Sequence, residues 1–338
     1  MEKQLPGRVL EALYNLGLAD PEIPVVATPL IGGVASDIWR VSQGNCIYCV
    51  KQALSRLKVA QSWEVPVERN AYEVAWFREV ARLCPDAVPR VLGHDIDAGV
   101  FVMDYLEPEL FPNWKQQLMS GRVNSDTAMR VADTLVHIHA GTAGDRDIAN
   151  RFPEDDLFHA IRLEPYFLAT AKAQPALLPV LTRLVDSVLD NKKALIHGDV
   201  SPKNILVGSR GPVILDAECA WYGDPAFDIA FLLNHLLLKS IYNPAFADLY
   251  RQCFDVMTLQ YLSGVDWESV SDLQARVAAM LPALFLARVD GKSPVEYLPG
   301  DQQQALVRTI ALPLIIEPLK TIEAVGDYCF SAQAKRNV

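Results

Sequence analysis

The sequence lacks several features that would assign it to a broad class at once. Its net charge is −10, so it lacks the basic excess that binding to nucleic acid or an anionic membrane requires. No apolar run approaches the ~20 residues of a membrane span. Residues 1–17 lack the apolar core and cleavage site of a signal peptide. These absences favour a cytoplasmic globular protein with neither a nucleic-acid nor a membrane partner.

Cysteine is sparse and forms no framework. The six cysteines include one CxxC pair, Cys46 and Cys49, in a segment with strand character. Residues three apart on a strand point to opposite faces, so this pair is poorly placed to bind one metal ion. Reduced thiols in a cytoplasm are therefore expected.

The sequence does contain a dense group of polar residues within 194–232. The group consists of His197, Gly198, Asp199, Asn204, Asp216 and Glu218. Phosphoryl transfer from a nucleotide needs a carboxylate that orients the attacking hydroxyl, and oxygen ligands that hold magnesium against the phosphates. Asp199 fits the first role. Asn204 and Asp216 fit the second, with Glu218 as a further candidate.

The residues between these side chains read as a hairpin. Runs 205–207 and 213–215 are rich in β-branched residues, and 208–212 joins them with two glycines and a proline. Such a hairpin would hold Asn204 and Asp216 at neighbouring strand ends.

The pattern HGDxxxxN followed by DxE resembles the catalytic and metal-binding loops of the aminoglycoside phosphotransferase and choline kinase superfamily, relatives of the protein kinases. Protein kinases have Arg in place of Gly198 and Phe-Gly after the metal-binding Asp. This sequence has neither, and it has no long activation segment between Asp216 and Asp228. The resemblance implies a small-molecule kinase that uses ATP and Mg²⁺. It also implies an α+β, bilobal, protein-kinase-like fold, with a small antiparallel-sheet N-lobe (1–105) and a larger, mostly helical C-lobe (106–338).

The first 105 residues contain the elements that such an N-lobe needs. Apolar residues repeat at helical spacing over 2–18, and strand-like runs follow. Gly32 and Gly33 separate two of these runs, where the missing side chains would let the backbone cover a phosphate. Two more strands within 85–104 complete a sheet of about five strands with one principal helix.

Lys51 ends an otherwise apolar strand, where an unpaired charge is disfavoured. A carboxylate partner is therefore expected on the next helical stretch, 67–83. Glu73 is favoured because it lies well inside that stretch, whereas Glu68 is near its start. Paired with Glu73, Lys51 would grip the nucleotide's α- and β-phosphates. The alternative is a surface lysine whose stem alone is buried.

Two stretches resemble the methylthioribose kinases in particular. Residues 51–73 share with that group a Lys-Gln-Ala-Leu start, a Ser-Trp, a Pro and a helix with the pairing Glu. The segment from Met103 to Pro108, which contains Tyr-Leu-Glu-Pro, resembles its hinge. The resemblance implies that backbone groups from Met103 to Tyr105 bind adenine.

Beyond Pro108 the composition changes to amphipathic and apolar helical patterns. Helices are predicted over 109–120, 125–140, 154–172, 175–192, 229–240, 244–263, 267–290 and 302–325. Asp228 follows a Gly-Asp-Pro that opens one of them. The resemblance implies that Asp228 supports the catalytic loop by accepting hydrogen bonds from its amides, and His197 is expected to lie in the same supporting group. The alternative role for Asp228 is a charge at the start of a helix.

The substrate region is the least defined part of the sequence. Methylthioribose kinases have an arginine pair on a C-lobe helix, whereas this chain has Arg288 followed by Asp290. These two residues either bind hydroxyls of the acceptor or pair with each other at the helix end. The expected partner is a small hydroxyl-bearing molecule, most simply a sugar, thiosugar or amino alcohol, and a homodimer is a second possibility.

Two rival functions stay open. An aminoglycoside-type antibiotic phosphotransferase would share every catalytic residue and bind its cationic drug in an acidic cleft. Glu109, Asp155 and Asp156 are the candidates for such a cleft. A nucleotide-binding pseudokinase should have lost at least one of Lys51, Asp199 and Asp216, and all three are present.

Overall fold

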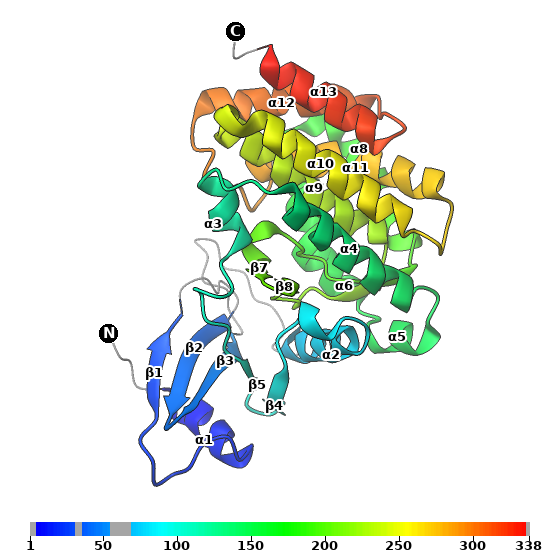
Figure 1. Ribbon diagram of the computed structural model, residues 1–338. Coiled ribbons are helices and arrows are strands. Elements are labelled where there is room, and N and C mark those ends of the chain that lie inside the picture. The colour runs from blue at the N-terminus through cyan, green and yellow to red at the C-terminus, as the bar shows by residue number, and fades with distance from the viewer. Residues whose placement is uncertain (1–4, 31–35, 55–68, 336–338) are drawn as a thin grey trace. The chain divides into compact units, whose positions relative to one another are not determined.

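The computed structural model describes residues 5–30, 36–54 and 69–335 (Figure 1). Gly32, Gly33 and Glu68 lie outside these ranges. The chain forms two compact units, which are described separately. The first unit comprises Met1–Phe111 with Leu215–Glu218, and the second comprises Pro112–Ile214 with Cys219–Val338.

The first unit is built on a five-stranded antiparallel sheet with the order β1-β2-β3-β5-β4. Its elements are α1 (Gly7–Asn15), β1 (Val26–Pro29), β2 (Ser36–Gln43), β3 (Cys46–Ala53), α2 (Arg69–Leu83), a short 3₁₀ turn η1 (Pro85–Ala87), β4 (Val91–Asp95) and β5 (Val100–Asp104). Buried side chains of α1, such as Leu13, pack with Trp39, Val50 and Val102 of the sheet in one hydrophobic cluster. In the central strand β3, Lys51 pairs with Ile38 of β2 and Phe101 of β5.

The second unit is mostly helical. Its longer helices are α3 (Trp114–Met119), α4 (Ser125–Thr142), α5 (Arg146–Arg151), α8 (Leu178–Asp190), α9 (Pro225–Tyr242), α10 (Ala247–Ser263), α11 (Val270–Asp290), α12 (Asp301–Ile316) and α13 (Ile322–Ala334). Between α5 and α8 lie α6 (Asp155–Phe158), the π-helix η2 (His159–Leu168), α7 (Ala169–Ala173) and the 3₁₀ turn η3 (Pro175–Leu177). A further 3₁₀ turn, η5 (Pro244–Phe246), precedes α10.

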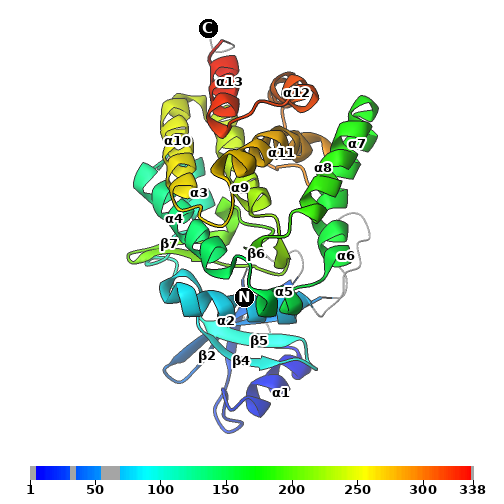
Figure 2. The same ribbon diagram turned by 90° about the vertical axis from the view of Figure 1, so that its right-hand side faces the viewer.

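Helix α9 is the centre of this second unit. Every residue from Pro225 to Ile241 is buried, and α10 and α11 flank the helix (Figures 1 and 2). Its start is fixed by Asp224, whose side chain caps the amide of Ala226 at 3.0 Å. A helix that is buried on all sides supplies a rigid support for the loops attached to it.

Two short antiparallel pairs carry the polar residues noted in the sequence. Strand β6 (Ala194–Ile196) pairs with β9 (Trp221–Gly223). The 3₁₀ turn η4 (Pro202–Asn204) then leads into the hairpin of β7 (Ile205–Gly208) and β8 (Gly211–Ile214), which is the hairpin predicted from the sequence.

The prediction of one helix over 302–325 is wrong. The chain forms α12 and α13 with a break between Ile316 and Ile322. Pro318 explains the break, because proline has no amide hydrogen and disfavours helical geometry in the residue before it. That residue, Glu317, has φ −124° and ψ 83°.

Helix α11 is the one helix of the described residues that is long and apolar enough, by length and composition alone, to cross a membrane. Many of its apolar side chains, including Leu281, Leu284 and Leu286, are fully buried within the second unit. This burial is typical of a core helix of a folded domain.

Candidate active site

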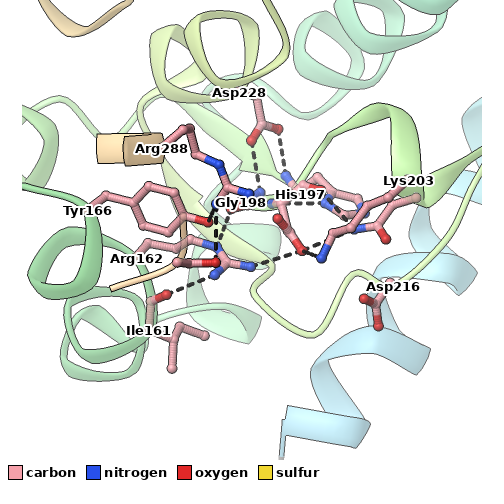
Figure 3. A network of polar contacts seen from close by, with 12 residues as sticks. Ile161, Arg162, Tyr166, His197, Gly198, Lys203, Asp216, Asp228 and Arg288 are labelled. Carbon is pink, nitrogen blue, oxygen red and sulfur yellow. Dashed lines mark hydrogen bonds and ion pairs between the residues drawn. The ribbon is translucent and has the colours of Figure 1, made fainter. Parts of the chain in front are cut away.

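The loop between β6 and η4 is anchored by a buried carboxylate. Asp228 of α9 is fully buried, and its two oxygens accept the amides of His197 at 2.7 Å and Gly198 at 2.8 Å (Figure 3). His139 of α4 contacts Asp228 through Nε2 at 3.3 Å and Tyr261 through Nδ1 at 2.7 Å. The loop is therefore held to the central helix by backbone bonds to a fixed side chain.

Gly198 is required by the backbone of this loop. It has φ +75°, and a Cβ built there would lie 2.6 Å from the carbonyl oxygen of Cys219 and 2.9 Å from the ring of Phe158. A side chain is excluded both by the left-handed conformation and by lack of space. This explains in physical terms why the residue before Asp199 is glycine.

Asp199 follows this glycine and is nearly buried. Its Oδ2 lies 3.1 Å from Nη2 of Arg162 and 3.1 Å from Nζ of Lys203, and it accepts Nδ2 of Asn204 at 3.0 Å. Arg162 is itself fixed by donating Nε to the carbonyl oxygen of Gly198 at 2.6 Å (Figure 3). Three donors therefore fix the orientation of the Asp199 carboxylate.

The side-chain amide nitrogen of Asn204 donates both of its hydrogen bonds to Asp199. Nδ2 donates to the backbone oxygen of Asp199 at 2.9 Å and to Oδ2 at 3.0 Å. This orientation turns the Oδ1 of Asn204 away from Asp199. A neutral oxygen in this position is of the kind that Mg²⁺ accepts as a ligand.

Within the first unit, Lys51 is buried between two carboxylates. Its Nζ lies 2.7 Å from Oε2 of Glu73 on α2 and 2.5 Å from Oδ1 of Asp216. Lys51 and Glu73 are 3% and 1% exposed, which sets this lysine apart from a surface lysine with a buried stem. Burial opposes the charge on Lys51, but Asp216 and then Glu73 outweigh it, so its pKa is raised. Burial raises the pKa of Glu73 to about 7, against the opposing effect of Lys51.

Asp216 has an unusual backbone. With φ +67°, it is the one residue other than glycine with positive φ in the described ranges. Such a conformation costs about 1–3 kcal/mol and persists where the surroundings impose it, often at functional sites. Glu218 lies close enough to Lys51 to contribute to raising its pKa. The carboxylates of Asp216 and Glu218 are hard oxygen donors of the kind that Mg²⁺ accepts as ligands.

These observations agree with the comparison to known proteins. Residues 26–258 match the phosphotransferase enzyme family, APH. The chain belongs to this family. The match spans well over half of the chain, from β1 into α10, and it confirms the relationship predicted from the HGDxxxxN and DxE motifs.

Relatives within and around the family are distant. Methylthioribose kinase from Pectobacterium atrosepticum is 26% identical over 317 residues, which cover 81% of this chain and 78% of that protein. The same enzyme from Yersinia pseudotuberculosis is 26% identical over 253 residues, with coverage of 66% and 61%.

Solved structures confirm the fold. A choline/ethanolamine kinase family protein from Mesorhizobium loti has a TM-score of 0.51 at 16% identity, covering 97% of this chain and 94% of that chain. Ethanolamine kinase from Plasmodium vivax has a TM-score of 0.52 at 10% identity, with coverage of 95% and 86%. The predicted α+β, protein-kinase-like fold, with an antiparallel sheet followed by a mostly helical region, is therefore correct.

The segment predicted as the family's hinge leaves the sheet at Tyr105. Met103 is buried in β5, between Cys49 of β3 and Val91 of β4. The ring of Tyr105 lies 5.2 Å from the guanidinium of Arg40. Adenine binding by this segment stays a prediction, as does phosphate binding by the two glycines outside the described residues.

Arg288 and Asp290 do not pair with each other. Arg288 donates Nη1 to the hydroxyl of Tyr166 at 2.9 Å and to Oγ of Ser293 at 3.2 Å (Figure 3). Asp290 instead forms an ion pair with Arg308 at 2.7 Å. The helix-end pair considered from the sequence is therefore wrong, and the two side chains have separate roles.

Arg162 and Tyr166 were not predicted from the sequence as site residues. Both lie on η2, a π-helix that contains Pro165. Because π-helical bonds span five residues, side chains four apart lie nearly on one line, and such segments often occur at functional sites. The guanidinium of Arg162 is 5.8 Å from the Tyr166 ring centre. The proline inside a helical pattern was the one signal in the sequence that this segment is irregular.

The three acidic residues considered for a drug-binding cleft differ in their surroundings. Asp155 accepts the indole Nε1 of Trp221 at 2.9 Å and pairs with Lys192 at 2.5 Å. Its charge is thus largely compensated. Glu109 and Asp156 are exposed.

Proposed function

We propose that this phosphotransferase moves the γ-phosphoryl group of ATP, with Mg²⁺, to a hydroxyl of a small molecule. The acceptor classes that we favour are a sugar or thiosugar, of which methylthioribose is one, and an amino alcohol. The observation that carries the proposal is the fixed carboxylate of Asp199, held by Arg162, Lys203 and Asn204 beside a loop bound to Asp228.

The second unit supplies the groups for the acceptor. Asp199 would orient the hydroxyl and receive its proton as the hydroxyl oxygen bonds to the γ-phosphorus and the bond to the β–γ bridging oxygen breaks, which releases ADP. Arg162 and Lys203 are positioned to compensate negative charge near Asp199. Catalysis of this kind consists mostly of alignment and charge neutralisation.

The first unit supplies the groups for the nucleotide. Lys51, held by Glu73, would contact the α- and β-phosphates, as the buried ion pair suggests. Asp216 and Glu218 would hold Mg²⁺, for which Asn204 of the second unit is proposed as a further ligand, and the ion would neutralise charge on the phosphates. The strained backbone of Asp216 supports this role, because the fold maintains it at a cost.

Two alternative functions have less support. An aminoglycoside acceptor calls for uncompensated acidic side chains, and of the three candidates Asp155 is paired with Lys192. A pseudokinase is disfavoured because Lys51 and Asp216 form a close ion pair and Asp199 has three polar partners.

The test is ADP formation against a panel of sugars, thiosugars, amino alcohols and aminoglycosides, using the wild type and Asp199→Asn. The substitution removes the proton acceptor, and we expect turnover to fall about a hundredfold to ten-thousandfold. Asp186→Asn, at an exposed position of α8, is the matched control and should retain activity. Wild-type turnover by Asp199→Asn with its active acceptor would refute the assignment.

A further inference from the structure

One face of the central helix α9 carries a lysine buried in an apolar setting. Phe231, His235 and Lys239 are spaced four apart, so they lie on the same side of the helix. Lys239 is 1% exposed. Its contacts are to Tyr297, at 3.4 Å from the hydroxyl and 4.9 Å from the ring centre. Among the described residues, no carboxylate forms an ion pair with it.

Two further buried nitrogens, one on α9 and one on α11, have no hydrogen-bond partner. His235 is 6% exposed and its Nδ1 has no hydrogen-bond partner. The buried Nε of Arg288 on α11 likewise has none. We name His235, Lys239 and Arg288 the basic cluster. Buried polar groups are nearly always paired, and a buried cation without a counter-charge is especially costly.

Glu296, which acts on Lys239, and Asp290, two residues beyond Arg288, already have basic partners. Glu296 pairs with Lys115, and Asp290 pairs with Arg308 at 2.7 Å. The pKa of Lys239 is lowered to about 7, mainly by burial and then by the nearby charges of Lys115 and Arg288. Glu296 is the one group that raises this pKa. Burial also lowers the pKa of His235, and the other groups that lower it are all cations, Lys203 among them. The local potential is therefore positive, although the whole chain is acidic.

The basic cluster is joined to the catalytic carboxylate by Tyr166. The guanidinium of Arg288 is 5.6 Å from the Tyr166 ring centre and that of Arg162 is 5.8 Å from it. Arg162 in turn lies 3.1 Å from Asp199. Figure 3 shows Arg288, Tyr166 and Arg162 as a continuous row that leads to the loop at Gly198. The ring of Phe231 contacts both Tyr166 and His235, at 5.3 Å and 5.5 Å between ring centres.

We propose that the basic cluster binds an anionic group of the acceptor, a carboxylate or a phosphate, while the acceptor's hydroxyl lies at Asp199. This inference rests on the proposed phosphotransfer to a hydroxyl, and it replaces the neutral sugars, thiosugars and amino alcohols favoured above by a sugar acid, hydroxy acid or sugar phosphate. A bound anion supplies what the cluster lacks, a negative charge and several hydrogen-bond acceptors. The same cations would repel choline, ethanolamine or an aminoglycoside.

Matched pairs of acceptors test the charge preference. The pairs are D-glycerate with glycerol, D-gluconate with D-glucose, and ribose 5-phosphate with ribose, with choline as the cationic compound. We expect kcat/KM for at least one anionic member to exceed that of its neutral partner by about tenfold or more. A neutral member or choline as the preferred acceptor would overturn the inference while leaving the phosphotransferase function intact.

Binding is measured independently of turnover by the melting temperature of the full chain. Inorganic phosphate, D-glycerate, D-gluconate and ribose 5-phosphate serve as probes, since a ligand of the folded state raises Tm. We expect at least one of them to raise the Tm of the wild type. The same probe should have little effect on Lys239→Met and Arg288→Gln, and its full effect on the exposed control Lys320→Met. No shift with any anion, or an equal shift in Lys239→Met, would overturn the inference.

The Tm of unliganded Lys239→Met separates a binding role from a structural one. Methionine keeps the volume and removes an uncompensated buried charge, so we expect Tm to rise while anion protection is lost. A fall in Tm would indicate that Lys239 stabilises the fold and would contradict the inference.

Discussion

Replacing Gly198 by alanine tests how the loop that carries Asp199 is held. The residue has φ +75°, and its new Cβ would lie 2.6 Å from the carbonyl oxygen of Cys219. The left-handed conformation costs an L-residue about 1–2 kcal/mol. Overpacking against backbone adds about 1–3 kcal/mol. We therefore expect Gly198→Ala to lower the free energy of unfolding by roughly 2–5 kcal/mol.

Gly144→Ala is the matched control for this experiment. Gly144 has φ +70°, but nothing lies within 4 Å of its built Cβ. Alanine there carries the conformational cost without the clash, so we expect a loss of about 1–2 kcal/mol. The difference between the two variants isolates the contacts of the new Cβ with Cys219 and Phe158.

Urea denaturation and steady-state kinetics provide the readouts. Both variants should lower the urea midpoint without changing the slope m, with the larger shift for Gly198→Ala. Because relief of the clash must move the peptide next to Asp199, we expect kcat to fall at least tenfold in Gly198→Ala and to stay near wild type in Gly144→Ala. Equal stability and equal kcat in the two variants would refute this explanation of the loop.

Two further predictions concern the metal and the pH dependence. Asp216→Ala should abolish the tightening of ATP binding by Mg²⁺, measured by calorimetry with and without the metal, because Asp216 is a proposed ligand of that ion; equal enhancement in both proteins would contradict the role. The second concerns Lys239, whose pKa of about 7 lies below the ordinary 10.5. Between these two pKa values the folded protein binds fewer protons than the unfolded chain, so the free energy of unfolding of the wild type rises with pH. Lys239→Met lacks this titration. The stability difference between the variant and the wild type should therefore become smaller as the pH rises from 7 to 10.5. The charged and titratable groups around Lys239 are Lys115, Arg288, Glu296 and His235. The urea midpoints of the wild type and Lys239→Met are compared at pH 6.5 and pH 9.5. A difference between the two midpoints that does not become smaller at pH 9.5 would contradict the lowered pKa of Lys239.

Much of the fold follows from local patterns in the sequence. The apolar period and closing Gly17 predict α1, which ends at Asn15 with Gly17 at φ +68°. Two β-branched runs around a turn predict the β7–β8 hairpin. The split between α12 and α13 was missed because the apolar period continues across it, whereas Pro318 ends the first helix. The helical spacing of apolar residues therefore identifies helices better than it identifies where they end.

The candidate site was predictable only where its residues share a motif. Asp199 and Asn204 lie five residues apart, so local spacing was enough to group them. Arg162 is 37 positions from Asp199 in the chain, and only the folded structure brings its guanidinium to within 3.1 Å of that carboxylate. Lys239 stands at the end of a run of leucines and reads as part of an apolar helix. Its lack of a counter-charge is a property of the packing around it and has no local signature.

The most direct test of the central claim is the product of the reaction, followed by ³¹P NMR with ATP and the active acceptor. The account predicts that the wild type forms ADP and a phosphate monoester of the acceptor in equal amounts, and that Asp199→Asn forms almost none of the ester. Formation of ADP with inorganic phosphate instead of the ester, or an undiminished yield of ester from Asp199→Asn, would contradict it.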